Sequence, residues 1–149
     1  MFTKFEIMSK SAKVYFFFDN VKFNLRNRGE IKKTVERIFK REGRKLERIT
    51  YIFCTDKRLL EINRQFLKHD YYTDIVTFDL SEPDTPTTAE VYISLDRVRD
   101  NAQKMDVSIT NELKRVIFHG ALHLCGYGDK TKAEREKMRG REDFYLNGS

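Results

Sequence analysis

The stretch HGALHLCGYGD, residues 119–129, constrains this chain more than any other part of the sequence. The residues before it, 110–118, have apolar side chains at helical spacing, and Thr110 is a suitable N-cap. His119 and His123 are four residues apart, so on a continuous helix they lie one turn apart on the same face. Two imidazoles in this arrangement can bind one metal ion without a change in the backbone.

A glycine turn completes the pattern. Gly126 is suited to end the helix with a positive φ, and the reversal carries Asp129 back towards the two histidines. The spacing is that of the metzincin peptidases, H-E-x-x-H-x-x-G-x-x-H, with aspartate in place of the third histidine. An aspartate oxygen is an ordinary zinc ligand, so we expect one Zn²⁺ per chain, held by His119, His123 and Asp129; other divalent transition metals would also fit.

The same comparison argues against a protease. Gly120 stands where a metallopeptidase has the glutamate that takes a proton from water. Two other interpretations stay open at this stage. Two histidines and one carboxylate also form the facial triad of non-haem iron oxygenases, and paired histidines on an apolar helix are often only packed side chains.

Composition and charge restrict the class of protein. The chain has 149 residues, of which 40% are hydrophobic and 35% charged, so we expect one soluble globular domain over residues 1–149. No apolar run reaches membrane-spanning length, and Cys54 and Cys125 form no disulfide framework, which together favour a cytoplasmic protein without a membrane partner. The net charge of +6 suggests a polyanionic partner.

The hydrophobic pattern predicts an α+β fold, with a mixed sheet of about four strands covered by about five helices. Strands are expected at residues 13–18, 49–53, 73–78 and 91–93, with a short additional candidate at 21–25. Besides the histidine helix, helices are expected at 30–42, from Thr55 to Phe66, at 96–105 and at 132–146, and residues 81–89 read as a loop. The helix at 30–42 is rich in lysine and arginine, which indicates either a solvated face or part of a surface that follows phosphates.

The histidine stretch resembles the signature H-G-x-L-H-L-x-G-Y-D-H of the YbeY family of metal-dependent, single-strand-specific endoribonucleases. The resemblance runs from about residue 50 to the C-terminus. It includes Asp70, Thr73, Asp74 and Phe78 within a second family motif, and the strand segment 90–94.

This resemblance implies an endoribonuclease that acts on single-stranded RNA in 16S rRNA 3′-end maturation and ribosome quality control. It implies a metal-bound water that attacks the phosphodiester, and ribosomal RNA and the ribosomal subunit as partners. No general base or other catalytic side chain is identified. The alternative is a non-catalytic ribosome-assembly or RNA-binding factor with a structural metal site; a metallopeptidase is third.

The sequence departs from the family pattern at Asp129, at Gly128 and at Leu67, which stands where the family has an arginine thought to contact substrate. A leucine donates no hydrogen bond to a phosphate, so that role is either empty or taken by Lys68 or His69. Tyrosines could stack on unpaired bases, the candidates being Tyr71, Tyr72 and Tyr127.

Overall fold

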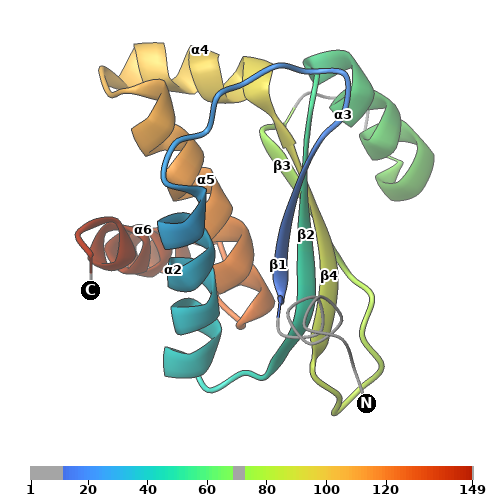
Figure 1. Ribbon diagram of the computed structural model, residues 1–149, viewed down its shortest axis with the longest axis vertical. Helices are drawn as coiled ribbons and strands as arrows, with labels where there is room; N and C mark the ends of the chain where they lie inside the picture. Colours follow the sequence, from blue (N-terminus) through green and yellow to red (C-terminus); the bar gives the residue numbers. More distant parts are fainter. Residues whose placement is uncertain (1–11, 69–72, 149) are drawn as a thin grey trace, which may run out of the picture.

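A four-stranded sheet with helices packed on it forms the molecule (Figure 1). The computed structural model describes residues 12–68 and 73–148. In this part of the chain the strands are β1 (Val14–Phe18), β2 (Leu46–Cys54), β3 (Ile75–Asp79) and β4 (Thr87–Ser94). The helices are α2 (Arg28–Arg41), α3 (Asp56–Ile62), α4 (Leu95–Met105), α5 (Ile109–Leu124) and α6 (Lys132–Leu146), with a π-helical turn, η1 (Asn63–Leu67), after α3.

The sheet is mixed, in the order β1-β2-β4-β3. β1, β2 and β4 run parallel, and β3 pairs antiparallel with β4 at the edge. Helices α2 and α5 cover one face, α6 packs on the outer side of α5, and α3 lies on the opposite side of the sheet (Figure 1). The predicted α+β class, the four strands and the five α-helices are therefore confirmed for the residues that the structure describes.

Helix α5 is buried because apolar side chains surround most of it. It lies close to the sheet at Gly120, where a Cβ atom would stand 3.0 Å from Ile75 Cδ1 and 3.1 Å from Val91 Cγ1. A buried hydrogen bond of 2.9 Å, from the hydroxyl of Tyr51 in β2 to the carbonyl of Ile117, fixes α5 along the sheet. The histidine helix is thus held in place along its length.

Several boundaries differ from the prediction. The cap of α5 is Ser108, whose Oγ accepts from the Asn111 N–H, so the helix begins at Ile109 and its cap lies two residues before the expected one at Thr110. Strand β4 begins at Thr87, inside the stretch that read as a loop. Residues 21–25 form no strand, because their apolar side chains pack against the helices; the ring of Phe23, for example, lies under the guanidinium of Arg99 in α4.

Both cysteines are buried thiols. Burial raises the pKa of Cys54 and of Cys125 to about 12, which keeps both protonated at neutral pH. Among the residues described, no helix combines the length and the apolar character that a membrane crossing requires.

Candidate metal centre

The turn after α5 has the geometry that the sequence predicted. Gly126 has φ of 105°, a conformation that side-chain-bearing residues rarely adopt. Its N–H donates to the His123 carbonyl at 3.0 Å, and the Tyr127 N–H donates to the Leu122 carbonyl at 3.1 Å. These two bonds form a Schellman motif, which ends the helix and reverses the chain towards Asp129.

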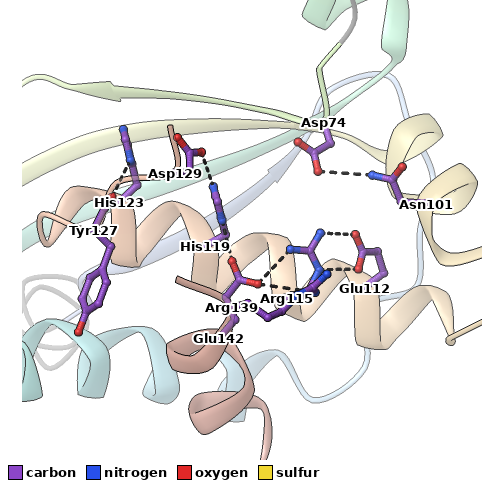
Figure 2. Close-up of polar contacts among 10 residues, drawn as sticks. All are labelled: Asp74, Asn101, Glu112, Arg115, His119, His123, Tyr127, Asp129, Arg139 and Glu142. Atoms are coloured by element: carbon purple, nitrogen blue, oxygen red, sulfur yellow. Dashed lines mark hydrogen bonds and ion pairs between the residues drawn. The ribbon is translucent and has the colours of Figure 1, made fainter. Parts of the chain in front are cut away.

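The His119 ring lies between the carboxylates of Glu142 and Asp129 (Figure 2). Its Nδ1 lies 2.7 Å from Oε2 of Glu142 in α6, and its Nε2 lies 3.4 Å from Oδ2 of Asp129. An ionised carboxylate only accepts hydrogen bonds, so the proton belongs on Nδ1. The lone pair of Nε2 is then directed towards Asp129. This carboxylate–histidine arrangement is typical of metal-binding histidines.

His123 has the same tautomer for a different reason. Its Nδ1 lies 3.1 Å from the backbone oxygen of Tyr127, which can only accept, so Nδ1 carries the proton and Nε2 keeps its lone pair. Figure 2 shows both imidazoles rising from the same side of α5, with the Asp129 carboxylate between them in this view. The donor chemistry of the three predicted ligands therefore suits zinc.

The side chains of the three predicted ligands are not yet close enough together to form a complete metal site. Among residues 12–68 and 73–148, no group of three histidine, cysteine, aspartate or glutamate side chains is gathered closely enough to hold an ion. His119 and Asp129 are in contact, whereas the His123 ring is exposed. A three-ligand zinc site at His119, His123 and Asp129 accordingly stays a prediction.

A buried charge network stands behind His119 (Figure 2). Arg115 makes two hydrogen bonds to Glu112, of 2.7 and 2.6 Å, and a third of 3.0 Å to Glu142. The Glu112 and Glu142 side chains are 0% and 2% exposed. A charge buried to this extent persists only when it is paired, so the network holds Glu142 ionised against His119.

The network shifts the pKa values of both partners. Burial raises the pKa of Glu142, but the hydrogen bond from His119 and the charge of Arg115 outweigh it, so the net shift is downward. Burial lowers the pKa of His119, but its bond to Glu142 and the charges of Glu142, Asp74 and Asp129 give a net shift upward. Without metal, His119 therefore holds a proton more firmly than an ordinary histidine does.

Sequence reasoning missed Glu142, which is the group that orients His119. A signal for it was present: Met138, Glu142 and Tyr145 are spaced as one face of α6, and all three are buried. A single carboxylate on an otherwise apolar helix face requires a buried partner. Its partner, however, lies on another helix, and that pairing cannot be read from spacing within α6.

Two arginines lie beside the predicted ligands. A cavity of about 240 Å³ is lined by His119 and Asp129 together with Arg135 and Arg139 of α6. Arg135 donates to the Lys130 carbonyl at 2.7 Å, and Arg139, half exposed, lies 3.9 Å from Glu142. The sequence had pointed to the loop after residue 67 for phosphate contacts, and the structure shows a second source of positive charge at the site itself.

The other predicted contact residues have mixed outcomes. Leu67 ends η1 with its side chain 39% exposed, and Lys68 follows it in the left-handed conformation. The remaining candidates of that loop, His69, Tyr71 and Tyr72, lie outside the described residues.

Tyr127 is packed rather than offered to a base. Its hydroxyl donates to Glu42 Oε1 at 2.7 Å, and the ammonium of Lys137 lies 5.6 Å from the centre of its ring. Glu42 also accepts hydrogen bonds from Arg141 and Tyr145. The carboxylate thereby ties the turn after α5 to α2 and α6, and Tyr127 has a structural role in the described structure.

Comparison with known proteins identifies the family. The sequence model of the family described as Endoribonuclease YbeY matches residues 18–149. The chain belongs to the YbeY family. A protein named Endoribonuclease YbeY from Cytophaga hutchinsonii is 46% identical over 93% of this chain and 96% of its own length. The protein of the same name from Porphyromonas gingivalis is 43% identical over 91% of this chain and 89% of its own length. The YbeY relative from Bacteroides thetaiotaomicron is 50% identical over 70% of this chain and 75% of its own.

A solved structure supports the fold assignment. The solution structure of TM1509 from Thermotoga maritima has a TM-score of 0.63 and 27% identity, and the match covers 89% of this chain and 86% of that one. The expected resemblance to YbeY is thus confirmed. So is the prediction that the chain belongs among the hydrolases of the nuclease class, because its relatives carry that name.

Proposed function

We propose that this chain is a metal-dependent endoribonuclease that cuts single-stranded RNA in the cytoplasm, where it takes part in 16S rRNA 3′-end maturation and ribosome quality control. The observation that carries the proposal is the placement of His119. Glu142 fixes its Nδ1 at 2.7 Å, and its Nε2 faces Asp129 at 3.4 Å, which prepares a ligand position on a buried, rigid helix. Membership of the YbeY family gives the reaction class.

His119, His123 and Asp129 would hold one Zn²⁺ ion. Such an ion would supply a water acidic enough to serve as the nucleophile at neutral pH, and positive charge for the phosphate oxygens. Glu142 keeps His119 in the tautomer that offers Nε2, and the Tyr127 carbonyl does the same for His123. Both histidines are thereby prepared before any ligand arrives.

Arg135 and Arg139 would bind the substrate's phosphate groups. Their guanidinium groups line the cavity that also contains His119 and Asp129, and the planar fork of arginine matches phosphate oxygens. They supply the positive charge that Leu67 cannot.

The packing of Gly120 argues against the peptidase alternative. A side chain at this position would be directed at Ile75 and Val91 of the sheet, within 3.0 to 3.1 Å at the Cβ atom. A glutamate base at the peptidase position would therefore collide with the sheet.

The test is cleavage of a single-stranded RNA by zinc-loaded protein. Wild type should cut the RNA, while the His123→Ala variant and a chelated wild-type sample should not. Zinc content is measured alongside by atomic absorption, with about one ion expected per wild-type chain. If wild type binds one zinc and cuts no faster than His123→Ala, the metal is structural and the proposed enzyme activity is wrong.

A further inference from the structure

A second, larger cavity lies between the end of α2 and the start of β2. Its volume is about 600 Å³, and the buried side chains of Phe39 and Leu46 line it. Its charged lining consists of Lys13, Lys40, Arg44 and Lys45, with Glu36 and Glu47 as the only acids among the lining residues. We call these four cations and the hollow between them the basic groove. Neither the metal centre nor the fold requires it.

We propose that the basic groove binds the backbone of the single-stranded RNA at phosphates remote from the bond that is cut. This inference rests on the proposed function, because it extends the path of the same substrate. Of the two interpretations of the lysine-rich helix, the proposal adopts the phosphate-following surface for the C-terminal end of α2.

The cations of the basic groove are not neutralised by carboxylates of the residues that the structure describes. Within residues 12–68 and 73–148, none of them makes an ion pair with a carboxylate. Other cations of α2 do have partners: Lys33 lies 3.9 Å from Glu30, and Lys32 and Arg41 lie over aromatic rings. Positive charge that is concentrated in a concave surface without neutralising acids attracts a polyanion.

The groove adjoins the turn that carries the predicted metal ligands. Arg44 Nη2 lies 3.3 Å from the position that a Cβ atom would have at Gly126, which is three residues from both His123 and Asp129. Helices α2 and α5 end at the same end of the molecule (Figure 1). A strand whose phosphate lies at Asp129 can therefore continue past Gly126 to Arg44 and into the basic groove.

The lining also indicates how the RNA is recognised. Phe39, the one aromatic residue of the lining, is 1% exposed and cannot stack on a base. Lysine side chains are point charges that bind phosphate without reading a sequence. The groove should therefore lengthen the contact with RNA without adding a preference for particular bases.

The experiment compares two double variants. The groove pair is Lys40→Gln/Lys45→Gln. The control pair is Lys22→Gln/Lys57→Gln, which removes the same charge from exposed lysines before α2 and on α3, at the other end of the molecule. Binding of zinc-free protein to a fluorescent 16-nucleotide RNA of mixed sequence is measured by anisotropy across salt concentrations. Each phosphate contact on a single strand contributes about 0.7 to the salt slope, so losing two should reduce the slope by about 1.4. If the groove variant and wild type bind equally at 1 M salt, the variant should therefore bind about 25-fold more weakly than wild type at 0.1 M salt.

Cleavage of the 16-mer and of a 4-nucleotide RNA by zinc-loaded protein separates the two proposals. If the groove pair has weaker 16-mer binding and a lower salt slope than the control pair, and cuts the 4-mer at the wild-type rate, the groove is supported. If it binds and cuts the 16-mer like the control pair, the groove proposal is wrong and the enzyme proposal stands. If wild type cuts neither RNA while the groove pair still loses 16-mer binding, the groove stands and the enzyme proposal fails.

Discussion

The role of Glu142 can be tested by the substitution Glu142→Gln, which preserves the shape of the side chain and removes its charge. Glutamine keeps an oxygen that can accept from His119 or Arg115 but no longer carries the charge that strengthens both bonds, now 2.7 and 3.0 Å long. Hydrogen bonds to charged groups contribute about 1.5–3 kcal/mol, and neutral ones about half of that. Weakening two of them should lower the free energy of unfolding by about 1.5–3 kcal/mol.

The same substitution should weaken metal binding. Groups that orient a metal-binding histidine typically change the affinity by about 10- to 100-fold, and we expect a loss in this range for zinc. A competition titration with a chromophoric chelator measures it. The control is Glu136→Gln, on the same helix but 69% exposed and 4.0 Å from Lys132, its ion-pair partner among the described residues. It should leave zinc affinity unchanged.

The pH dependence of stability gives a third measurement. The pKa of His119 is raised in the folded protein, so its stabilising effect is complete below the ordinary value of about 6.5 and is lost as the pH rises through the folded pKa. Metal-free wild type should therefore lose stability above pH 6.5, by at most about 1.4 kcal/mol per pH unit from this group. The lowered pKa of Glu142 adds nothing to this slope, because its stabilising effect is lost only as the pH falls below about 4.5.

Urea unfolding of the metal-free proteins between pH 6 and pH 8 checks this. In Glu142→Gln the largest upward contribution to the His119 pKa is gone, while burial still lowers this pKa and only the charges of Asp74 and Asp129 still raise it, so the decline above pH 6.5 should become smaller. If the variant and wild type have parallel stability profiles and equal zinc affinity, Glu142 neither charges nor orients His119, and the account of the metal centre given above is wrong.

Three other substitutions test separate parts of the structure. Gly120→Val should destabilise the protein by about 1–3 kcal/mol in thermal or urea unfolding, because the valine side chain would enter the space of Ile75. An unchanged free energy of unfolding would contradict the close approach of α5 to the sheet. Tyr51→Phe should cost about 1 kcal/mol by urea unfolding, since it leaves a buried carbonyl without its 2.9 Å hydrogen bond, and a neutral result would mean that another donor replaces it. Arg139→Ala should lower kcat/KM for RNA roughly tenfold with zinc content unchanged, as expected from the loss of one partly exposed contact to phosphate; unaltered kinetics would remove it from the substrate site.

The parts of the site that the sequence predicted are those that depend on neighbours along the chain. The one-turn spacing of His119 and His123 follows from helix geometry, and the turn at Gly126 follows from the conformational freedom of glycine. The predicted cap at Thr110 was wrong, because the structure has Ser108, another residue that can cap a helix, at this position.

The parts that could not be predicted depend on which elements meet. Residues 21–25 alternate like a strand, but the alternation reflects packing against helices. Thr87 belongs to β4 because it pairs with Leu46 of β2, although the prolines nearby indicated a loop. The approach of Arg44 to Gly126 is likewise a contact between distant segments.

The charge network around Arg115 is better explained by function than by stability. Burying Glu112, Arg115 and Glu142 removes charged groups from water, and well-packed apolar side chains in such places are often as stabilising as the ion pairs. An apolar replacement, however, could not accept the Nδ1 proton of His119. The ring could then rotate and exchange tautomers, and its Nε2 lone pair would no longer be directed at Asp129. The network ends on Nδ1 of His119, and a proton on Nδ1 leaves Nε2 free to bind a metal. The position of the network, on the side of the His119 ring away from Asp129, is therefore the strongest structural argument for a metal at Asp129.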